Sequence, residues 1–439
     1  MADQSIIRIT KARYHALAVA FRDRDVRSVK ALIIGPHETP YEFGFFEFAV
    51  KFNKEYPRKS PAVTATTTNS GRCRFNPNIY GTGKVCLTWR GERGEEWSAA
   101  QGLESILLSI QSLMSSNPYE NEPGFEDAHQ SQDKKNQKDY IAKIRHETLR
   151  ISIIQRLEDY LGIAANGTVT PASERELYDL DMDDDELEME DSAVPWEPFK
   201  DLCKRRFLWY YDSYLETIKK AKEEVKDGQP FARMPFEGAS NTMDGKFNYT
   251  ELEQRIRKIK AALDAETETW AMEGVSPKMR DTTVAVNLTR QCEQIKESYK
   301  RSDVPNNVEL VDNNPFVWNL TYFGRPMTNL DGGMFRIRLN FSPRFPEEQP
   351  RVKFLTSMFH HRIAADGTPC YFPNPSRRED VKQHIDAVIE ALEEEQPPYD
   401  PRTLVHPEAH KLYWGNPSER KTYNRQLRRS VQRSMEEGF

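Results

Sequence analysis

The sequence predicts an α+β fold that occurs twice along the chain. Two stretches place a glycine, an aromatic–proline pair and a further proline at the same spacing, with the two prolines 22 and 26 residues after the glycine. These residues are Gly35, Pro57 and Pro61 in the first copy, and Gly324, Pro346 and Pro350 in the second. Turn-forming residues that recur at one spacing indicate that the same hairpin-rich sheet is built twice.

Each copy has the pattern of a helix followed by an antiparallel sheet. Residues 46–52 and 335–341 alternate apolar and polar side chains for much of their length, which is typical of half-buried strands in a meander. Upstream of them, residues 6–21 and 284–299 have a helix-like distribution of apolar side chains. We therefore expect an N-terminal helix and a four-stranded antiparallel sheet in both copies.

C-terminal helices are expected after each sheet. Residues 103–114 carry a continuous apolar face at helical spacing, and residues 381–392 carry a weaker one. Before the first of these helices, Ser98 and Gln101 have the spacing of a capping box, in which each side chain bonds the other residue's backbone. Both helices are predicted to pack on their sheets.

The region between the two copies has a different composition. Residues 174–191 hold eleven acidic residues against the single base Arg175, and such a run is typical of a solvated linker. Residues 199–225 and 249–270 have the pattern of long amphipathic helices. The predicted organisation is a first α+β domain over 1–165, an acidic linker over 166–196, a helical module over 197–275 and a second α+β domain over 282–439.

Composition excludes several classes of protein. The 439-residue chain is 30% charged and 38% hydrophobic, and its five scattered cysteines include no CxxC pair, so neither a disulfide scaffold nor a structural metal site is expected. The most apolar stretch, 103–114, is far shorter than the roughly 20 residues that span a bilayer. The first residues lack the pattern of a secretory signal. We expect a protein of the cytoplasm and/or nucleus with no membrane partner.

One cysteine lies in a setting that favours chemistry. Cys86 follows Asn76-Pro77 and the Gly81-x-Gly83 pair, which are typical of turns, so it is predicted on an irregular segment beside the sheet. Asn78 lies eight residues before it, and its amide could donate to an oxyanion on an acyl group carried by the thiol. An isolated cysteine is more often a small buried hydrophobe, but this spacing favours a nucleophile.

These motifs together resemble the ubiquitin-conjugating (UBC) family. The resemblance rests on Gly35-Pro36, Thr39-Pro40-Tyr41-Glu42, Tyr56-Pro57, Pro61, Asn76-Pro77-Asn78, Cys86-Leu87 and Trp97-Ser98. Asn76, where the family usually has His, resembles the Z-type branch, which is charged by the divergent second ubiquitin-activating enzyme. Further stretches similar to that branch extend over roughly residues 1 to 265.

The resemblance implies an enzyme that works through a cysteine thioester. Cys86 would accept ubiquitin or a ubiquitin-like modifier from an activating enzyme and pass it to a lysine or to a ligase cysteine, with Asn78 as the oxyanion or loop-ordering residue. ATP is consumed by the activating enzyme, so no cofactor is expected here. The implied partners are the modifier, the activating enzyme, ligases and protein substrates, without nucleic acid.

The resemblance also implies partner-binding residues. The activating enzyme is expected on the first helix, at Arg8 and Lys11, and ligases on the loops that carry Pro61 and Trp97-Ser98-Ala99. An acid that gates the thioester is not assigned by the sequence alone. The candidates are Glu120, Asn121 and Glu122.

The second copy departs from the family pattern around its own cysteine. Cys370 has the usual distance from Pro350 and Asp400 matches the gatekeeper acid, which makes them a candidate second site. However, Arg362 replaces the Asn, Tyr371 replaces the Leu, and the Trp corner is missing. We predict a binding or regulatory domain with little or no conjugating activity, although Arg362 could itself donate to an oxyanion.

Two other functions compete with a tandem conjugating enzyme. A non-catalytic UBC-like scaffold that only binds ubiquitin or a partner is disfavoured for the first domain by Cys86 and Asn78, but stays open for the second. A Cys/His hydrolase needs a base hydrogen-bonded to the thiol, and no His lies near Cys86 in the sequence.

Overall fold

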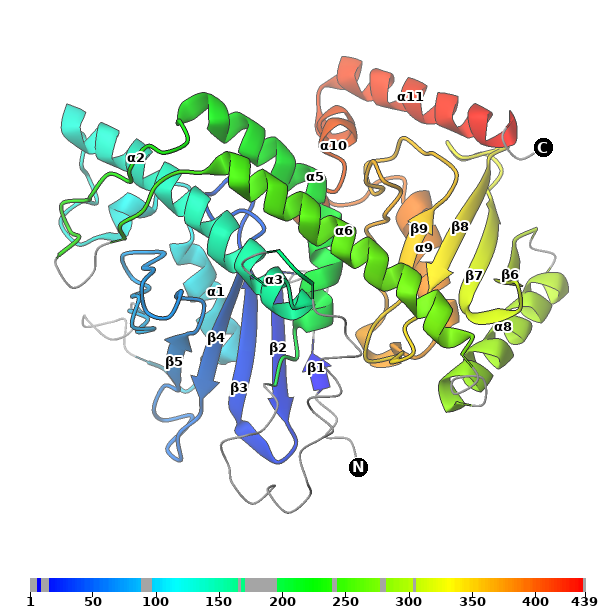
Figure 1. Cartoon of the computed structure of the whole chain (residues 1–439), viewed down its shortest axis with the longest axis horizontal. Coiled ribbons are helices and arrows are strands. Elements are labelled where there is room, and N and C mark those ends of the chain that lie inside the picture. The colour runs from blue at the N-terminus through cyan, green and yellow to red at the C-terminus, as the bar shows by residue number, and fades with distance from the viewer. Residues whose placement is uncertain are drawn as a thin grey trace. The chain divides into compact units, whose positions relative to one another are not determined.

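The computed structural model describes residues 6–8, 16–87, 97–164, 167–169, 196–238, 243–276, 282–302 and 305–436 (Figure 1). It divides into two compact units, which are described separately below. Unit 1 comprises Met1–Cys203 and Thr217–Ile259, and unit 2 comprises Lys204–Glu216 and Lys260–Phe439.

Unit 1 is built on a five-stranded antiparallel sheet with the strands in sequence order. The strands are β1 (Ile6–Arg8), β2 (Leu17–Arg22), β3 (Asp25–Ile34), β4 (Phe45–Lys51) and β5 (Ala62–Ala65). Opposite residues such as Ile33 and Phe46, or Ala31 and Phe48, point to one face, where their side chains join the core. The predicted α+β fold with an antiparallel sheet is therefore confirmed.

The N-terminal helix expected in the first copy is wrong for the described residues. Residues 6–8 and 17–22 are the strands β1 and β2, which add an edge to the sheet; residues 9–15 lie outside the described residues. β2 pairs with β3 along its length, and its Ala18 and Ala20 are buried as fully as Leu17. Because both faces of β2 are covered, the polar half of a strand pattern is absent, and its alanines favour a helical interpretation.

Helices cover both faces of this sheet. They are α1 (Leu103–Leu113), the 3₁₀ turn η2 (Pro118–Asn121), α2 (Ser131–Glu147), the π-helical η3 (Thr148–Gln155) and α3 (Arg156–Leu161). The predicted apolar face of α1 packs on the core through Ile106, Leu107 and Ile110. On the opposite face, Arg156 of α3 donates to buried Glu47 of β4 at 2.9 Å.

The predicted capping box forms only in part. The Gln101 side chain reaches back to the Ser98 backbone N–H at 3.4 Å, but the Ser98 hydroxyl accepts from Ala100 instead of Gln101. The helix begins four residues beyond Ala99, at Leu103, with Gly102 as its N-cap. Ser98–Gln101 is therefore a turn before the helix.

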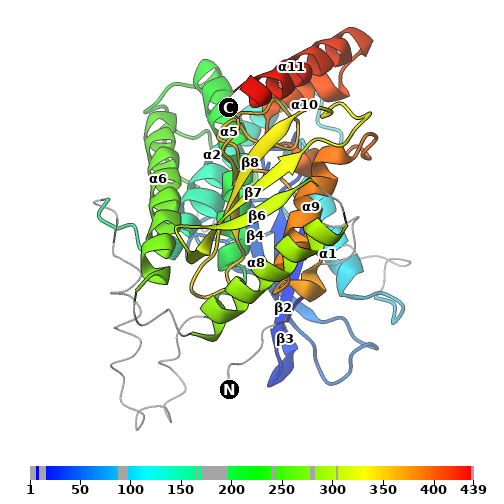
Figure 2. The same ribbon diagram turned by 90° about the vertical axis from the view of Figure 1, so that its right-hand side faces the viewer.

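Unit 2 has the predicted helix, four-stranded sheet and following helices. They are α8 (Thr283–Arg301), β6 (Asn307–Val311), β7 (Asn314–Phe323), β8 (Met334–Asn340), β9 (Arg351–Phe354), η5 (Pro375–Arg377), α9 (Val381–Glu393), η6 (Pro401–Thr403), α10 (Pro407–Trp414) and α11 (Pro417–Glu436). Figure 2 shows α8 alongside β6 and β7, with α9 beside it. Buried side chains of both helices form one core with the sheet.

The two copies share the same turn geometry, so the sequence repeat is a structural repeat. The Gly35 backbone N–H donates to Gly44 at 2.9 Å, and that of Gly324 donates to Gly333 at 2.9 Å. A Cβ added at either first glycine would lie 1.7 Å from a carbonyl oxygen, that of Tyr41 or Leu330. Only glycine fits such an approach of two backbone segments.

The two long helices predicted in the middle region are confirmed as α5 (Lys200–Glu224) and α6 (Tyr249–Gly274). Each contributes residues to both units: Lys204–Glu216 of α5, and α6 from Lys260 onward, belong to unit 2. A separate helical module over 197–275 and the acidic linker stay predictions.

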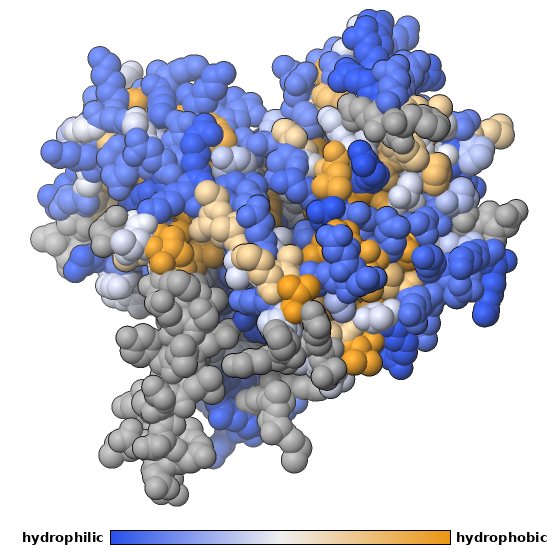
Figure 3. Space-filling model, turned by 45° about the vertical axis from the view of Figure 1, so that its right-hand side comes forward, coloured by the Kyte–Doolittle hydropathy of each residue, from blue (hydrophilic) through white to orange (hydrophobic). Residues whose placement is uncertain are grey.

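The described surface is mostly hydrophilic on the face drawn in Figure 3, although some large hydrophobic side chains such as Met272 and Met327 are exposed. On the face drawn in Figure 3, hydrophilic side chains predominate and hydrophobic ones form separate groups. Within the described ranges, no helix is long and apolar enough to cross a membrane, and no cluster of His, Cys, Asp or Glu has the arrangement of a metal site.

Candidate active site

The loop between β5 and α1 positions Cys86. The Cys86 backbone N–H donates to the Asn78 carbonyl at 2.8 Å, and Tyr80 pairs with Lys84 across the turn at 2.9 Å. This small hairpin holds the Asn78 backbone beside the cysteine, and the role of the Asn78 side chain stays a prediction. Cys86 is partly exposed, whereas the other four cysteines are buried.

Asn76 anchors this loop to the core. Its side chain is fully buried and donates to the Tyr41 hydroxyl at 3.0 Å and to the Leu113 carbonyl at 2.8 Å. Its side-chain oxygen accepts from the Asn78 backbone at 2.9 Å. The loop-ordering task therefore falls to Asn76, because the partly exposed Asn78 amide makes no hydrogen bond to the described residues.

A tyrosine that the sequence analysis did not select lies against the cysteine. The Tyr80 and Cys86 side chains lie close enough to interact electrostatically. Burial, followed by the charge of the Cys86 thiolate, raises the pKa of Tyr80. Tyr80 therefore keeps its proton near neutral pH, so its hydroxyl is available as a hydrogen-bond donor.

Arg74 and Glu122 support Tyr80. The Arg74 guanidinium lies 4.4 Å from the centre of the Tyr80 ring and donates to Glu122 at 3.0 Å. Among the three gatekeeper candidates, Glu122 is joined through Arg74 to Tyr80, but the gatekeeper assignment stays a prediction. Asn121 is used structurally, since its amide donates to the Leu113 carbonyl at 2.7 Å. The sequence could have indicated Tyr80 as a site residue, because it lies two residues after Asn78. No local sequence pattern indicated Arg74.

The predicted partner-binding residues have different settings. Pro61 is buried, whereas Ser98 and Ala99 are exposed. Trp97 is half-buried and its indole N–H donates to the Pro57 carbonyl at 2.7 Å, so it joins the corner to the loop after β4.

The expected docking site for the activating enzyme rests on a helix that is not present at Arg8. Arg8 ends strand β1, and Lys11 lies outside the described residues. Binding of the activating enzyme at these two residues stays a prediction, but the helix on which it was based is not present at Arg8.

Comparison with known proteins assigns the family. The profile of the family described as ubiquitin-conjugating enzyme matches residues 3–148 and 288–413, which is more than half of the chain. The chain belongs to the ubiquitin-conjugating enzyme family. Both units contain a matched segment, so the family domain occurs twice.

Its relatives include proteins named ubiquitin-conjugating enzyme E2 Z. The chain is 50% identical to the one from Xenopus tropicalis over 135 residues, 30% of this chain and 42% of that protein. It is 43% identical to the Danio rerio protein over 240 residues, 54% and 60% of the two chains. Identity to the Homo sapiens protein is 48% over 196 residues, 44% and 46% of the two chains. The chain thus spans 42–60% of the length of these relatives.

The ubiquitin-conjugating domain of unit 2 keeps the cysteine loop but changes its side chains. The Cys370 backbone N–H donates to the Arg362 carbonyl at 2.7 Å, which reproduces the bond between Cys86 and Asn78. Arg362 therefore occupies the Asn78 position, as the sequence predicted. The backbone of Ala364 pairs with Thr368 at 2.9 Å, as Tyr80 pairs with Lys84, so unit 2 also lacks the tyrosine.

His360 takes the place of Asn76 in unit 2. Its Nδ1 accepts from the Arg362 backbone at 3.1 Å, and its ring also bonds the Leu392 backbone. Burial, together with the charge of Arg362, lowers the pKa of His360 to about 3. The ring is therefore neutral near pH 7, with one donor and one acceptor, which is the pair that Asn76 supplies in unit 1.

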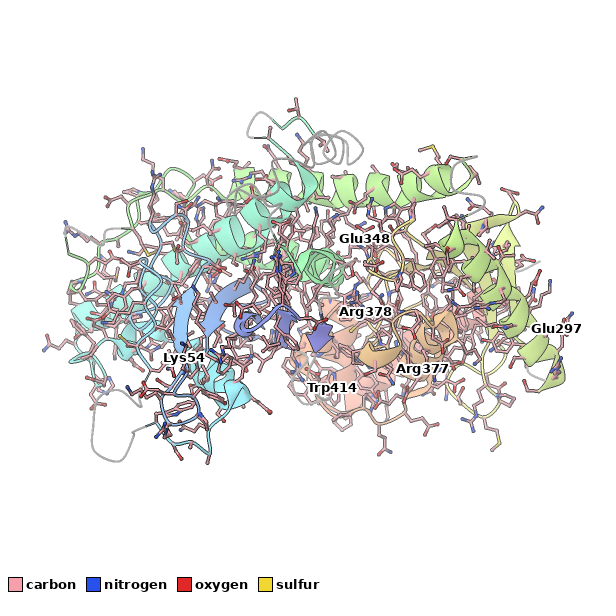
Figure 4. The ribbon with its side chains drawn as sticks, turned by 90° about the horizontal axis from the view of Figure 1, so that it is seen from below. Lys54, Glu297, Glu348, Arg377, Arg378 and Trp414 are labelled. Atoms are coloured by element: carbon pink, nitrogen blue, oxygen red, sulfur yellow. The ribbon has the colours of Figure 1, made fainter. Side chains whose placement is uncertain are left out.

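Two other parts of the unit 2 site differ from the expected pattern. Arg378, labelled in Figure 4, donates to the Pro346 carbonyl at 3.3 Å and so makes the tie that Trp97 makes to Pro57. Asp400, the predicted gatekeeper acid, forms a two-pronged ion pair with Arg402 at 2.6 and 2.8 Å. This carboxylate is already bound to a cation within its own turn.

Proposed function

We propose that unit 1 carries ubiquitin or a ubiquitin-like modifier as a thioester on Cys86. The Cys86 thiolate attacks the thioester carbonyl at the modifier's C-terminus, and the thiolate of the activating enzyme leaves. A lysine amine then attacks the new thioester, an amide forms, and the Cys86 thiolate leaves while solvent takes the amine proton. A ligase cysteine would receive the acyl group by a second thiol exchange.

One observation carries this proposal most directly. The partly exposed Cys86 lies in a hairpin with Asn78 opposite it, inside a segment that the family profile matches. The implied partners are the modifier, an activating enzyme, ligases and protein substrates. Similarity to E2 Z proteins supports charging by the second, divergent activating enzyme.

A charging assay tests the thioester. The protein is incubated with ubiquitin, ATP and each of the two activating enzymes, and a reducible adduct is sought on a gel. Cys86→Ser should give an adduct that resists reductant, because an oxygen ester replaces the thioester, and Cys86→Ala should give none. Cys370→Ala is the matched control and should charge normally. Undiminished charging of Cys86→Ala would refute the assignment.

The role of Asn78 is tested by separating charging from transfer. We expect Asn78→Ala to slow transfer to lysine about a hundredfold, the typical effect of losing an oxyanion donor, and to affect charging much less. Because Asn76 orders the loop, the hairpin should persist in this variant. An equal loss in both steps would show instead that Asn78 holds the loop.

For unit 2 we propose a binding or regulatory role, as an alternative to a second conjugating domain. Support comes from Arg362 and Ala364 at the positions of Asn78 and Tyr80, and from Asp400, which is already paired. In a Cys86→Ala background, a reductant-sensitive ubiquitin adduct that disappears with Cys370→Ala would show that unit 2 is catalytic.

A further inference from the structure

Residues Lys204–Glu216 of α5, called here the α5 cover, pack on unit 2 around its cysteine. Cys370 has no exposed surface, and the side chains of Arg206 and Tyr210 lie close enough to it to interact electrostatically. Arg206 is itself buried, over the rings of Trp209 at 4.1 Å and Phe372 at 5.2 Å. The thiol is thus enclosed by side chains more than 150 residues earlier in the chain.

The α5 cover contacts all three chain segments that flank the cysteine. On the segment before it, the Ala365 backbone N–H donates to Asp212 at 3.3 Å. On the segment after it, the Trp209 ring meets Phe372 edge to face at 5.5 Å.

The third segment is the turn that carries Asp400. The Tyr210 hydroxyl donates to the Arg402 carbonyl at 2.9 Å, and the Ser213 hydroxyl to the Leu404 carbonyl at 3.4 Å. An acyl donor would have to reach the sulfur between these three segments. The α5 cover fills that approach.

Packing and polar bonds both hold the α5 cover in place. Trp209 and Tyr210 are 5% and 0% exposed, so the burial of their aromatic rings stabilises the packing of the α5 cover on unit 2. Lys260 of α6 lies over the Tyr211 ring of the α5 cover at 5.9 Å and forms an ion pair with Asp366 at 3.0 Å. A cavity of about 410 Å³ remains along one side, lined in part by Trp209, Asp366 and Tyr371. The buried side chains of the α5 cover are not part of the core that the sheet of unit 2 forms with α8 and α9.

We propose that the α5 cover is a built-in inhibitor of the second cysteine, which keeps Cys370 closed to any acyl donor or thiol reagent until these residues move away. Burial also raises the pKa of the Cys370 thiol, so the enclosed group is a poor nucleophile. The proposed lack of conjugating activity in unit 2 then has two causes. Side chains at the site are replaced, and a helix covers the cysteine.

The test is site-resolved alkylation of the native full-length protein with N-ethylmaleimide, followed by peptide mass spectrometry. In the unaltered protein we expect Cys370 to react at least about a hundredfold more slowly than Cys86. In the Trp209→Ala/Tyr210→Ala variant, Cys370 should react at least about tenfold faster than before. Lys219→Ala, an exposed position on the same helix, is the matched control and should leave Cys370 protected.

Cys292 distinguishes local release from unfolding, because it is buried in α8 of the same unit. Local release labels Cys370 while Cys292 stays protected, which supports the proposal. If both are labelled, the milder Asp212→Ala/Lys260→Ala variant decides, because it removes the acceptor for the Ala365 N–H and the ion pair to Asp366, and it should still accelerate Cys370 alone. Rapid labelling of Cys370 in the unaltered protein, or unchanged protection in both variants, would overturn the proposal. None of these readouts needs ubiquitin, so their outcome is independent of charging at Cys86.

Discussion

At the scale of single residues, the two units solve one problem with different side chains. Asn76 and His360 each sit buried at the start of the cysteine loop, and each accepts from the backbone two residues later. Asparagine serves because it has the same donor and acceptor as a neutral imidazole. The His-to-Asn change in unit 1 is thus a conservative change in hydrogen bonding, although the residue types differ in sequence.

This equivalence predicts a hierarchy of substitutions at Asn76. Asn76→Ala leaves the Asn78 N–H without its acceptor and removes the donor to the Tyr41 hydroxyl, while the Leu113 carbonyl keeps its bond from Asn121. It should lower the free energy of unfolding of unit 1 by about 2–4 kcal/mol. Asn76→His should cost less than half as much, since His360 makes the equivalent bonds. Urea unfolding monitored by alkylation of Cys73, buried in unit 1, measures both. Equal losses in the two variants would contradict the shared role.

At the scale of elements, the turn before β4 links the sheet to the site. Gly35 and Gly44 close this turn, which fixes Tyr41. The Tyr41 hydroxyl donates to the Phe75 carbonyl at 2.7 Å and accepts from Asn76. The position of the cysteine loop therefore depends on a turn that is distant from Cys86 in sequence.

Gly35→Ala should disrupt this link. The new Cβ would lie 1.7 Å from the Tyr41 carbonyl oxygen, so the backbone must move. We expect a loss of about 3 kcal/mol or more in the stability of unit 1, together with slower charging of Cys86. Gly238→Ala is the matched control, because nothing lies within 4 Å of its added Cβ. Denaturant unfolding compares the two, and a Gly35→Ala variant as stable as the control would rule out the tight approach.

At the scale of the whole molecule, the two units share one fold but differ in the titratable side chains that they bury. Unit 2 encloses several neutral histidines, whereas the loop anchor of unit 1 does not titrate. Burial is the first cause that lowers the pKa of His360 to about 3 and of His384 to about 4. In unit 1, burial lowers the pKa of His37, but its contact with Glu42 outweighs this and raises it overall.

Mild acid should therefore destabilise unit 2 more than unit 1. His360 and His384 stay neutral in the folded unit but gain a proton below about pH 6.5 when unfolded, so stability is full above that pH and falls toward pH 4. The expected loss is about 1.4 kcal/mol per pH unit for each such histidine. The alkylation rates of Cys292 in unit 2 and of Cys73 in unit 1, measured in urea at pH 7.5 and 5.5, compare the stability of the two units. His360→Asn should make the stability of unit 2 less dependent on pH. An equal loss of stability in both units on acidification would contradict the prediction.

The sequence by itself determined the duplicated α+β frame and the family, and it predicted Cys86 and Asn78 as the central pair of the site. Glycine and proline spacing, strand alternation and the position of Asn78 before Cys86 are local patterns, and turns and strands depend largely on local geometry. The exchange of Asn78 for Arg362 in unit 2 was likewise predicted from position alone. The helix expected over residues 6–21 is wrong at 6–8 and 17–21, because small apolar alanines on β2 suit either period and pairing with β3 decided between helix and strand.

Only the tertiary structure decided which distant side chains reach each cysteine. Arg74 joins Tyr80 and Glu122, which come from separate turns, and no spacing in the sequence indicated this link. Which of Glu120, Asn121 and Glu122 gates the thioester stays a prediction. The α5 cover over Cys370 had no signal in the sequence, since Trp209 and Tyr210 have the pattern of any buried helical face. Their partners lie more than 150 residues away, and contacts at that separation are set by how the elements pack, which no local spacing records.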